Sequence, residues 1–168
     1  MEVQEFCKRV VSGLTLAALL ACAPSPASAF LVYVSNEKDN TVSVIDSTTM
    51  EVVKTIAVGQ RPRGIILTKD GKHLLICAGD DDTVQILDVA TNKIVGDLSS
   101  GPDPEQLNIH PSGNPVYIAN EDDSLTTAID LEGQLLWQVK ICDYVEHQGY
   151  GSSPALYQSL VIVSADNK

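Results

Sequence analysis

The chain has 168 residues and a formal net charge of −11 at neutral pH. This acidic balance argues against nucleic acid as a partner, because phosphate contacts need clustered Lys and Arg side chains. An anionic membrane surface is disfavoured for the same reason. Aromatic residues make up only 5% of the composition, so we expect a core of Val, Ile and Leu, which suits strands. The length indicates one domain.

Residues 1–29 have the features of an export signal. Lys8 and Arg9 form a short basic flank, and an apolar run of 14 residues follows from Val10 to Ala23. Such a run is too short to span a bilayer comfortably. An Ala-Ser-Ala triplet then ends at Ala29 and provides the small residues that a cleavage site requires. We therefore expect a mature protein that is periplasmic or secreted, with an uncleaved membrane anchor as the alternative.

A second interpretation of the same segment involves Cys22. The stretch Leu19–Cys22 resembles a bacterial lipobox, in which the cysteine is lipidated and becomes the mature N-terminus. Membrane attachment is expected only in that case. The fit is imperfect, because a small residue is more usual where Leu20 stands. Cleavage after Ala29 is the favoured prediction.

Two cysteines, Cys77 and Cys142, remain after residue 29. An exported protein could oxidise them to a disulfide. Cys77 lies within a predicted buried strand, where a free thiol behaves as a small hydrophobic side chain. The sequence favours a free, buried thiol and leaves the pairing open.

A 42-residue repeat organises the chain after the export signal. Three segments align without gaps, and they are Tyr33–Asp46, Leu75–Asp88 and Tyr117–Asp130. A repeat of this length with four short strands is typical of a propeller blade. A sandwich has similar strand spacing but no ungapped repeat. We predict an all-β fold, a partial β-propeller of about three four-stranded antiparallel blades.

Turn residues divide the second repeat into strands, with an Asp-Gly turn after the first of them. The strands predicted for this blade are Ile65–Thr68, His73–Ala78, Thr83–Asp88 and Ile94–Leu98, and the next blade begins with Gln106–His110.

The phase of the repeat leaves the ring incomplete. The mature chain begins near Leu31, at the second strand of a blade, and reaches only the second strand of a fourth blade. Propellers typically have four to eight blades, and an open stack exposes strand edges. The sequence favours a fragment of a larger propeller. A truncated reading frame and one part of an assembled ring are the alternatives.

Acidic residues recur in one loop of successive blades. We expect these loops to line one rim of the propeller and to attract cations, a small ligand or a basic partner protein. Calcium stays open, because it needs six to eight oxygen ligands and no EF-hand spacing is present. The competing interpretation is a set of solvated turns, which favour Asp and Asn. The candidate rim residues are Glu37, Asp39, Asp80, Asp81, Asp82, Glu121, Asp122 and Asp123.

Two basic residues, Arg61 and Arg63, enter the first strand of a blade, where a central channel is expected. Guanidinium groups there can hold an anionic ligand through paired hydrogen bonds. The equivalent positions of the next repeat are Asp103 and Glu105. This charge reversal argues against an anion site in every blade and leaves a single asymmetric contact.

No catalytic or metal-binding residue is predicted. His73, His110 and His147 are 37 residues apart, which differs from the 42-residue period and from zinc-ligand spacing. Asp143, Glu146 and His147 share one loop and could act as acid–base groups, but such loops are common on surfaces. We expect a protein without enzymatic activity, with an enzyme as the alternative.

The stretch YVSNEKDNTVSVID, together with the repeat that follows it, resembles the YVTN family of exported bacterial β-propellers. The similarity is greatest to the propeller associated with pyrroloquinoline-quinone-dependent catabolism. It covers residues 30–131 and implies a binding or scaffold role near periplasmic quinoprotein oxidation. Pyrroloquinoline quinone stays open as a cofactor on this resemblance, as calcium does from the acidic loops.

Residues 132–168 are similar instead to quinoprotein-like (pyrroloquinoline-quinone-binding-like) propeller repeats. The residues that show this similarity are Trp137 and the stretch SSPALYQSLVIVSADN. In those repeats the Trp docks one blade against the next, and this role is implied for Trp137. No position matches a quinone-cofactor site. The predicted function is thus an exported, non-enzymatic binding or scaffold propeller, and the alternative is a fragment or accessory subunit of a pyrroloquinoline-quinone-dependent oxidoreductase.

Overall fold

A computed structural model describes residues 30–141, 143 and 153–163. The predicted export signal with Cys22, and also Cys142, Glu146 and His147, lie outside these residues. The described chain contains thirteen strands and one short 3-10 helix, which confirms the all-β prediction. Over these residues, no helix has the length and apolar character needed to cross a membrane.

The strands form antiparallel sheets in chain order. The first sheet has three strands, the second and third have four, and the last is a hairpin. The first comprises β1 (Leu31–Asn36), β2 (Thr41–Asp46) and β3 (Glu51–Ala57). The second comprises β4 (Pro62–Leu67), β5 (His73–Ala78), β6 (Thr83–Asp88) and β7 (Lys93–Ser99). The third comprises β8 (Pro104–Ile109), β9 (Val116–Asn120), β10 (Leu125–Ile129) and β11 (Leu135–Lys140). The hairpin comprises β12 (Ala155–Tyr157) and β13 (Leu160–Ile162).

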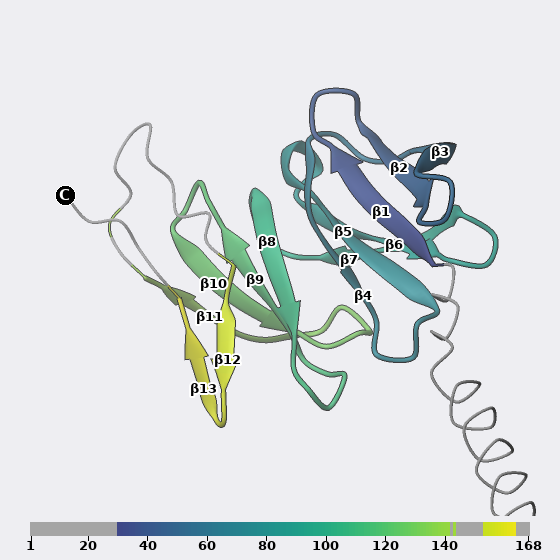
Figure 1. Cartoon of the computed structure of the whole chain (residues 1–168). Coiled ribbons are helices and arrows are strands. Elements are labelled where there is room, and N and C mark those ends of the chain that lie inside the picture. The colour runs from purple at the N-terminus through teal and green to yellow at the C-terminus, as the bar shows by residue number, and fades with distance from the viewer. Residues whose placement is uncertain (1–29, 142, 144–152, 164–168) are drawn as a thin grey trace, which may run out of the picture.

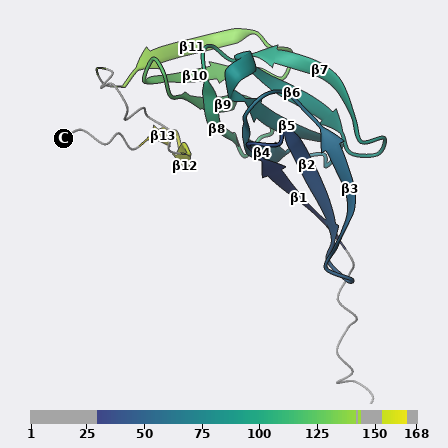
Figure 2. The same ribbon diagram turned by 90° about the horizontal axis from the view of Figure 1, so that it is seen from above.

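These sheets are successive propeller blades, called blades 1 to 4 below (Figure 1). Seen from above, they follow an arc with β1, β4 and β8 on its inner side and β3, β7 and β11 on its outer side (Figure 2). Among the described residues, blade 1 comprises three strands without a counterpart of β4 or β8, and blade 4 comprises only its hairpin. The partial propeller predicted from the repeat is therefore confirmed.

The aligned aspartates explain why the repeat is so regular at this point. Asp46, Asp88 and Asp130 each end or follow the strand that precedes the outer strand of a blade. Each accepts a hydrogen bond from a backbone N–H two or three residues further on. Such local bonds fix the turn that leads to the outer strand. The turn then contains Met50, Asn92 or Gly133 at positive φ. The turn of blade 3 is one residue shorter than those of blades 1 and 2, and it still contains a residue at positive φ.

An irregularity of strand pairing also repeats. The pairing with the outer strand shifts between Val44 and Ile45, between Ile86 and Leu87, and between Ala128 and Ile129, positions 42 residues apart. A bulge of this kind increases the local twist of a sheet. Each blade therefore carries the same twist, as radial stacking of blades requires.

Two apolar cores lie between blades rather than within them. Side chains of blade 1, among them Val42 and Val44, pack against Leu74, Ile76 and Leu87 of blade 2. The opposite face of blade 2 packs against blade 3 through a second cluster of buried residues, which are Leu75, Cys77, Val84, Leu98, Leu107, Val116, Ile118 and Ile129. Because strand side chains alternate between faces, blade 2 is buried on both sides.

The inner strands begin earlier than predicted. The sequence placed their starts at Ile65 and Gln106, but β4 starts at Pro62 and β8 at Pro104. Proline is tolerated at the first position of a strand because no N–H is needed there. The pairing then shifts before regular ladder contacts resume at Ile65. The prediction missed this irregular first segment.

Cys77 is fully buried between blades 2 and 3. Burial raises the pKa of its thiol, so the thiolate is strongly disfavoured. The buried position agrees with the expected strand location. The possible pairing with Cys142 stays untested, because that residue lies outside the described chain.

The blade contact leads to a stability prediction. Ile118 is 0% exposed in the core between blades 2 and 3. We expect Ile118→Ala to lower the free energy of unfolding by about 2–5 kcal/mol, through lost apolar contact and the cavity left behind. Chemical denaturation followed by circular dichroism measures this. Val95→Ala is the control, because Val95 is 59% exposed on β7; an equal loss in both variants would contradict a core between the blades.

Candidate functional site

Charged side chains converge where the inner strands begin. Arg61 precedes β4 and Arg63 lies within it, and one repeat later Asp103 precedes β8 and Glu105 lies within it. The opposite charges predicted at equivalent positions therefore face each other across the joint between blades 2 and 3. We call Arg61, Arg63, Asp103, Glu105 and Glu121 the charge cluster.

The ion pairs of the charge cluster are asymmetric. The Arg61 guanidinium contacts the carboxylates of Asp103 and Glu105, and it lies 3.1 Å from the latter. Arg63 contacts Glu105 and lies 3.5 Å from Glu121. Two acidic residues of the rim complete the arrangement, since Asp80 lies 2.9 Å from Arg61 and Glu37 lies 3.7 Å from Arg63. Five carboxylates thus surround two guanidinium groups.

Close backbone packing brings these groups together. Gly64 lies against β8, where an added Cβ would come within 2.8 Å of the Glu105 carbonyl oxygen. Gly79 lies against the cluster, where a Cβ would come within 2.7 Å of an Asp103 carboxylate oxygen. Position 64 therefore needs glycine, because a side chain there would force the two inner strands apart, whereas a side chain at position 79 would displace the Arg61 and Asp103 side chains.

Two carboxylates of the cluster are nearly removed from water. Asp103 is 6% exposed and Glu105 only 2%. Burial raises the pKa of Asp103, while its bond to Arg61 opposes the rise. The pKa of Glu105 is raised to about 7, mainly by burial and secondly by the nearby Glu121 side chain, while the Arg63 guanidinium opposes this rise. Burial lowers the pKa of both arginines, but the carboxylates outweigh it, so both stay charged.

Some of the predicted rim residues connect neighbouring segments. Asp82 accepts a hydrogen bond from the Asp103 N–H at 2.8 Å, and Asn40 accepts one from the Arg61 N–H at 2.9 Å. These acceptors are one repeat apart, and so are the two donors. Asp81 accepts from the Gln60 N–H at 2.7 Å. Asp81 and Asp82 therefore have a structural role in addition to their charge.

The acidic loops do occupy equivalent places, as the repeat predicted. They join β1 to β2, β5 to β6 and β9 to β10, on the side of the arc where the inner strands begin. We call loops 37–40, 79–82 and 121–124 the acidic rim. All predicted carboxylates on it are exposed except Glu121, which is partly buried.

Two hollows open on the acidic rim, and Arg61 and Asp80 border both. One has a volume of about 300 Å³ and is also lined by Gly79, Asp82, Asp103 and Asp122. The other has a volume of about 320 Å³ and is also lined by Glu37, Lys38, Asn40 and Gln60. Apart from Gly79, every residue that lines them has a polar or charged side chain, so a charged or hydrogen-bonding ligand suits them better than an apolar one.

Calcium does not fit the charge cluster. Carboxylate oxygens of Asp103, Glu105 and Glu121 lie within 4.8 Å of one another. A calcium ion needs six to eight oxygen ligands, and the guanidinium groups of Arg61 and Arg63 already contact these carboxylates. The cluster is therefore an ion-pair network, and we derive no function from a metal in it.

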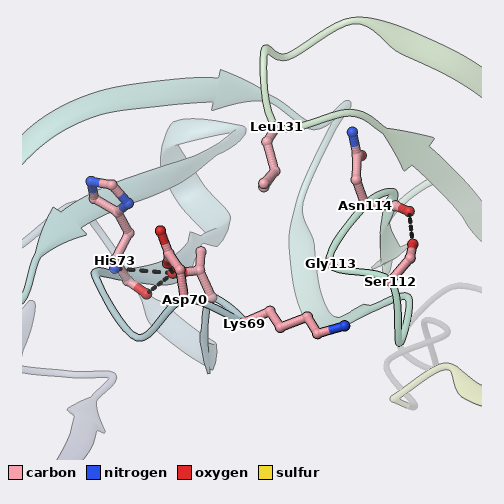
Figure 3. Close-up of a pocket in the computed structure, with 8 residues that line it drawn as sticks. Lys69, Asp70, His73, Ser112, Gly113, Asn114 and Leu131 are labelled. Atoms are coloured by element: carbon pink, nitrogen blue, oxygen red, sulfur yellow. Dashed lines mark hydrogen bonds between the residues drawn. The ribbon is translucent and has the colours of Figure 1, made fainter.

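A larger pocket, of about 430 Å³, lies at the other end of the blades, between the hairpin turns of blades 2 and 3. Leu131 points into this pocket, and Lys69 reaches across it toward the turn at Ser112 and Gly113 (Figure 3). The Lys69 ammonium donates a hydrogen bond to the Pro111 carbonyl at 2.7 Å. This cation is thus engaged in linking the two blades. The turns were predicted from the sequence, but the pocket was not.

Trp137 lies on β11, the outer strand of blade 3. Its ring centroid is 5.8 Å from that of Tyr117 in the same sheet, across Ala128. The two rings cover one face of blade 3, and Trp137 remains 41% exposed. Docking of Trp137 against another blade stays a prediction. Since β11 pairs with β10, the expected change of repeat type after Leu131 falls within one sheet.

Comparison with known proteins agrees with this geometry. Residues 6–145 match the family described as YNCE-like beta-propeller. The chain belongs to that family. A search of curated proteins finds no match. Among solved structures, the propeller is similar to Kuenenia stuttgartiensis hydrazine synthase, with a TM-score of 0.62 and 24% identity. The similarity covers 68% of this chain and 33% of that one, so the chain spans about a third of its length and shares its fold.

The charge cluster of this YNCE-like propeller predicts a pH dependence. The folded state raises the pKa of Glu105 from 4.5 to about 7, so the folded protein binds a proton that the unfolded chain releases. This contribution to stability is complete below about pH 4.5 and is lost as the pH rises to about 7. We expect Glu105→Gln to remove this decrease of stability between about pH 4.5 and 7, because glutamine does not titrate.

The measurement is the free energy of unfolding from pH 4.5 to 8, for the wild type and the variant. Their difference should change across this range and level off above it. Glu132→Gln, at an exposed turn position, is the matched control. A constant difference between wild type and Glu105→Gln would contradict the raised pKa.

Proposed function

We propose that this chain is an exported binding module, and that its acidic rim holds a basic partner protein or a cationic ligand. The β-propeller fold supports a scaffold or binding role. The observation that carries the proposal is the excess of carboxylates around Arg61 and Arg63 at the start of the inner strands. The arginines neutralise only part of the charge, and the exposed loops add more of the same sign.

The rigidity of the rim supports this proposal. The loops are tied to adjacent segments through Asn40, Asp81 and Asp82. Carboxylates held in fixed positions lose little conformational entropy when a partner binds. Their shared negative potential also accelerates the encounter with a basic surface. Specificity then comes from the two polar hollows beside Arg61.

Charge neutralisation on the rim tests the proposal. A triple variant, Asp39→Asn, Asp122→Asn and Asp123→Asn, removes exposed carboxylates that form none of the ion pairs described above. With a lysine-rich peptide as the probe, we expect about fivefold weaker binding, because three exposed charges contribute about 1 kcal/mol in total. Fluorescence anisotropy at low and at physiological salt measures the loss, which should be smaller at the higher salt.

The matched control changes the same net charge elsewhere. Glu51→Gln, Asp97→Asn and Glu132→Gln are exposed and lie outside the acidic rim. This control should bind the peptide almost as well as the wild type. Equal weakening by both triple variants would mean that net charge alone attracts the peptide, and the acidic rim would then not be the site.

Export is part of the proposal and rests on the residues that precede β1. Expression of the full chain in a bacterium with a periplasm should yield a mature protein that begins at Phe30, because the small-residue triplet ends at Ala29. Intact-mass analysis of the periplasmic fraction checks this. Cys22→Ser should leave processing unchanged. Loss of processing in this variant, with a lipid mass on the wild type, would favour the lipoprotein alternative.

A link to periplasmic quinoprotein metabolism is the finer part of the proposal. It rests on the resemblance of the first repeats to YVTN propellers and of residues 132–168 to quinoprotein-like repeats. The alternative, an accessory subunit or fragment of a pyrroloquinoline-quinone-dependent oxidoreductase, differs in one measurable respect. Only the alternative predicts a change in quinone absorbance, and dye reduction with an alcohol substrate, when pyrroloquinoline quinone and calcium are added.

A further inference from the structure

The pocket between the hairpin turns of blades 2 and 3 lies at the opposite end of the blades from the acidic rim, and the function proposed for the rim does not use it. Both turns and all of the lining residues belong to the described part of the chain. The volume of about 430 Å³ is in the range of small-molecule sites, which are concave and usually preformed. The chemistry of the lining indicates which ligand fits.

The pocket has apolar surface from two side chains. Leu131 packs against the core between blades 2 and 3 and points into the pocket (Figure 3). The stem of Lys69 extends across the pocket, and an added Cβ on Gly113 would lie 3.5 Å from its Cβ and Cδ atoms. The methylene groups of a long basic side chain provide apolar surface while its charged end stays polar. The pocket can therefore cover an aliphatic group of a ligand.

A carboxylate with an unused oxygen borders the pocket in blade 2. Asp70 Oδ1 accepts hydrogen bonds from the Thr68 hydroxyl at 2.7 Å and from the Lys72 N–H at 3.1 Å, whereas no described residue donates to Oδ2. These two bonds hold the carboxylate in place and lower the pKa of Asp70, so it is ionised at neutral pH. The ring of His73, which also lines the pocket, forms no hydrogen bond with the described residues. A donor group of a ligand can occupy this end.

The turn of blade 3 places a positive charge in the same pocket. The Lys69 ammonium donates to the Pro111 carbonyl at 2.7 Å, and an ammonium group has further N–H donors. No carboxylate of the described residues lies within ion-pair distance of Lys69. The side-chain amide of Asn114 also lines this side and has no hydrogen-bond partner among the described residues. An anionic group of a ligand can occupy this second end.

We infer that this pocket binds a small zwitterion with an aliphatic body, of about the size of a dipeptide. The ammonium group of the ligand contacts Asp70, its carboxylate accepts hydrogen bonds from Lys69, and its aliphatic side chain packs against Leu131. A ligand with one charge would meet a like charge at one end of the pocket, and an uncharged sugar would leave both protein charges unpaired.

The dipeptide Ala-Leu is the probe, with its N-acetylated and C-amidated forms as matched analogues. We expect saturable binding of Ala-Leu to the full chain, and about fivefold weaker binding of either analogue, because each loses one solvent-accessible ion pair. NMR titration of the methyl signals of the dipeptide gives the Kd. Physiological salt screens the net charge of the protein, so that the comparison reports the pocket.

Variants of the two charges assign the ends of the ligand. Asp70→Asn should weaken Ala-Leu about fivefold and leave the acetylated form unchanged, because that form has no ammonium group. Lys69→Met keeps the apolar stem, and it should weaken Ala-Leu but not the amidated form. The control variants Lys93→Met and Asp97→Asn, at exposed positions of β7, should leave every affinity unchanged. A variant that only disturbed its turn would weaken all three ligands.

Three results would overturn the inference. The first is the absence of saturable Ala-Leu binding, and the second is equal weakening of all three ligands by Asp70→Asn and by Lys69→Met. The third involves the rim variant with Asp39, Asp122 and Asp123 neutralised, which should bind Ala-Leu like the wild type. If this rim variant weakened Ala-Leu as much as Asp70→Asn does, the dipeptide would bind at the acidic rim. The rim proposal itself would not depend on either of the first two results.

Discussion

Face-to-face packing of successive blades is the interaction on which the structure depends. Each described core lies between two sheets, so blade 2 is stable only because blades 1 and 3 cover its faces. This explains why the same bulge recurs at 42-residue intervals. If one sheet twisted differently, its apolar residues would no longer meet those of its neighbour. The 42-residue period of the sequence therefore follows from the need of adjacent blades to pack against each other.

The charge cluster lies at the narrow end of the same joint. Where the inner strands approach most closely, Gly64 leaves no space for a side chain, and polar groups must be satisfied by partners from the next blade. Arg63 and Glu105 meet this requirement as a pair. Removing one partner would leave the other charge buried without compensation, which is more costly than the pair is favourable. The cluster thus fixes how adjacent blades are aligned, and its unpaired excess of carboxylates is what remains for binding.

Much of this arrangement could be predicted from the sequence. The ungapped repeat indicates equivalent environments, so blade number, strand order and the common position of the acidic loops follow from it. The charge reversal between Arg63 and Glu105 was visible in the sequence, but the ion pair between these two residues was not predicted. This ion pair forms because the inner strands of neighbouring blades lie side by side. The periodicity of the sequence does not give the distance between those strands. The pocket beside Lys69 was missed for a similar reason, since it exists only between two turns.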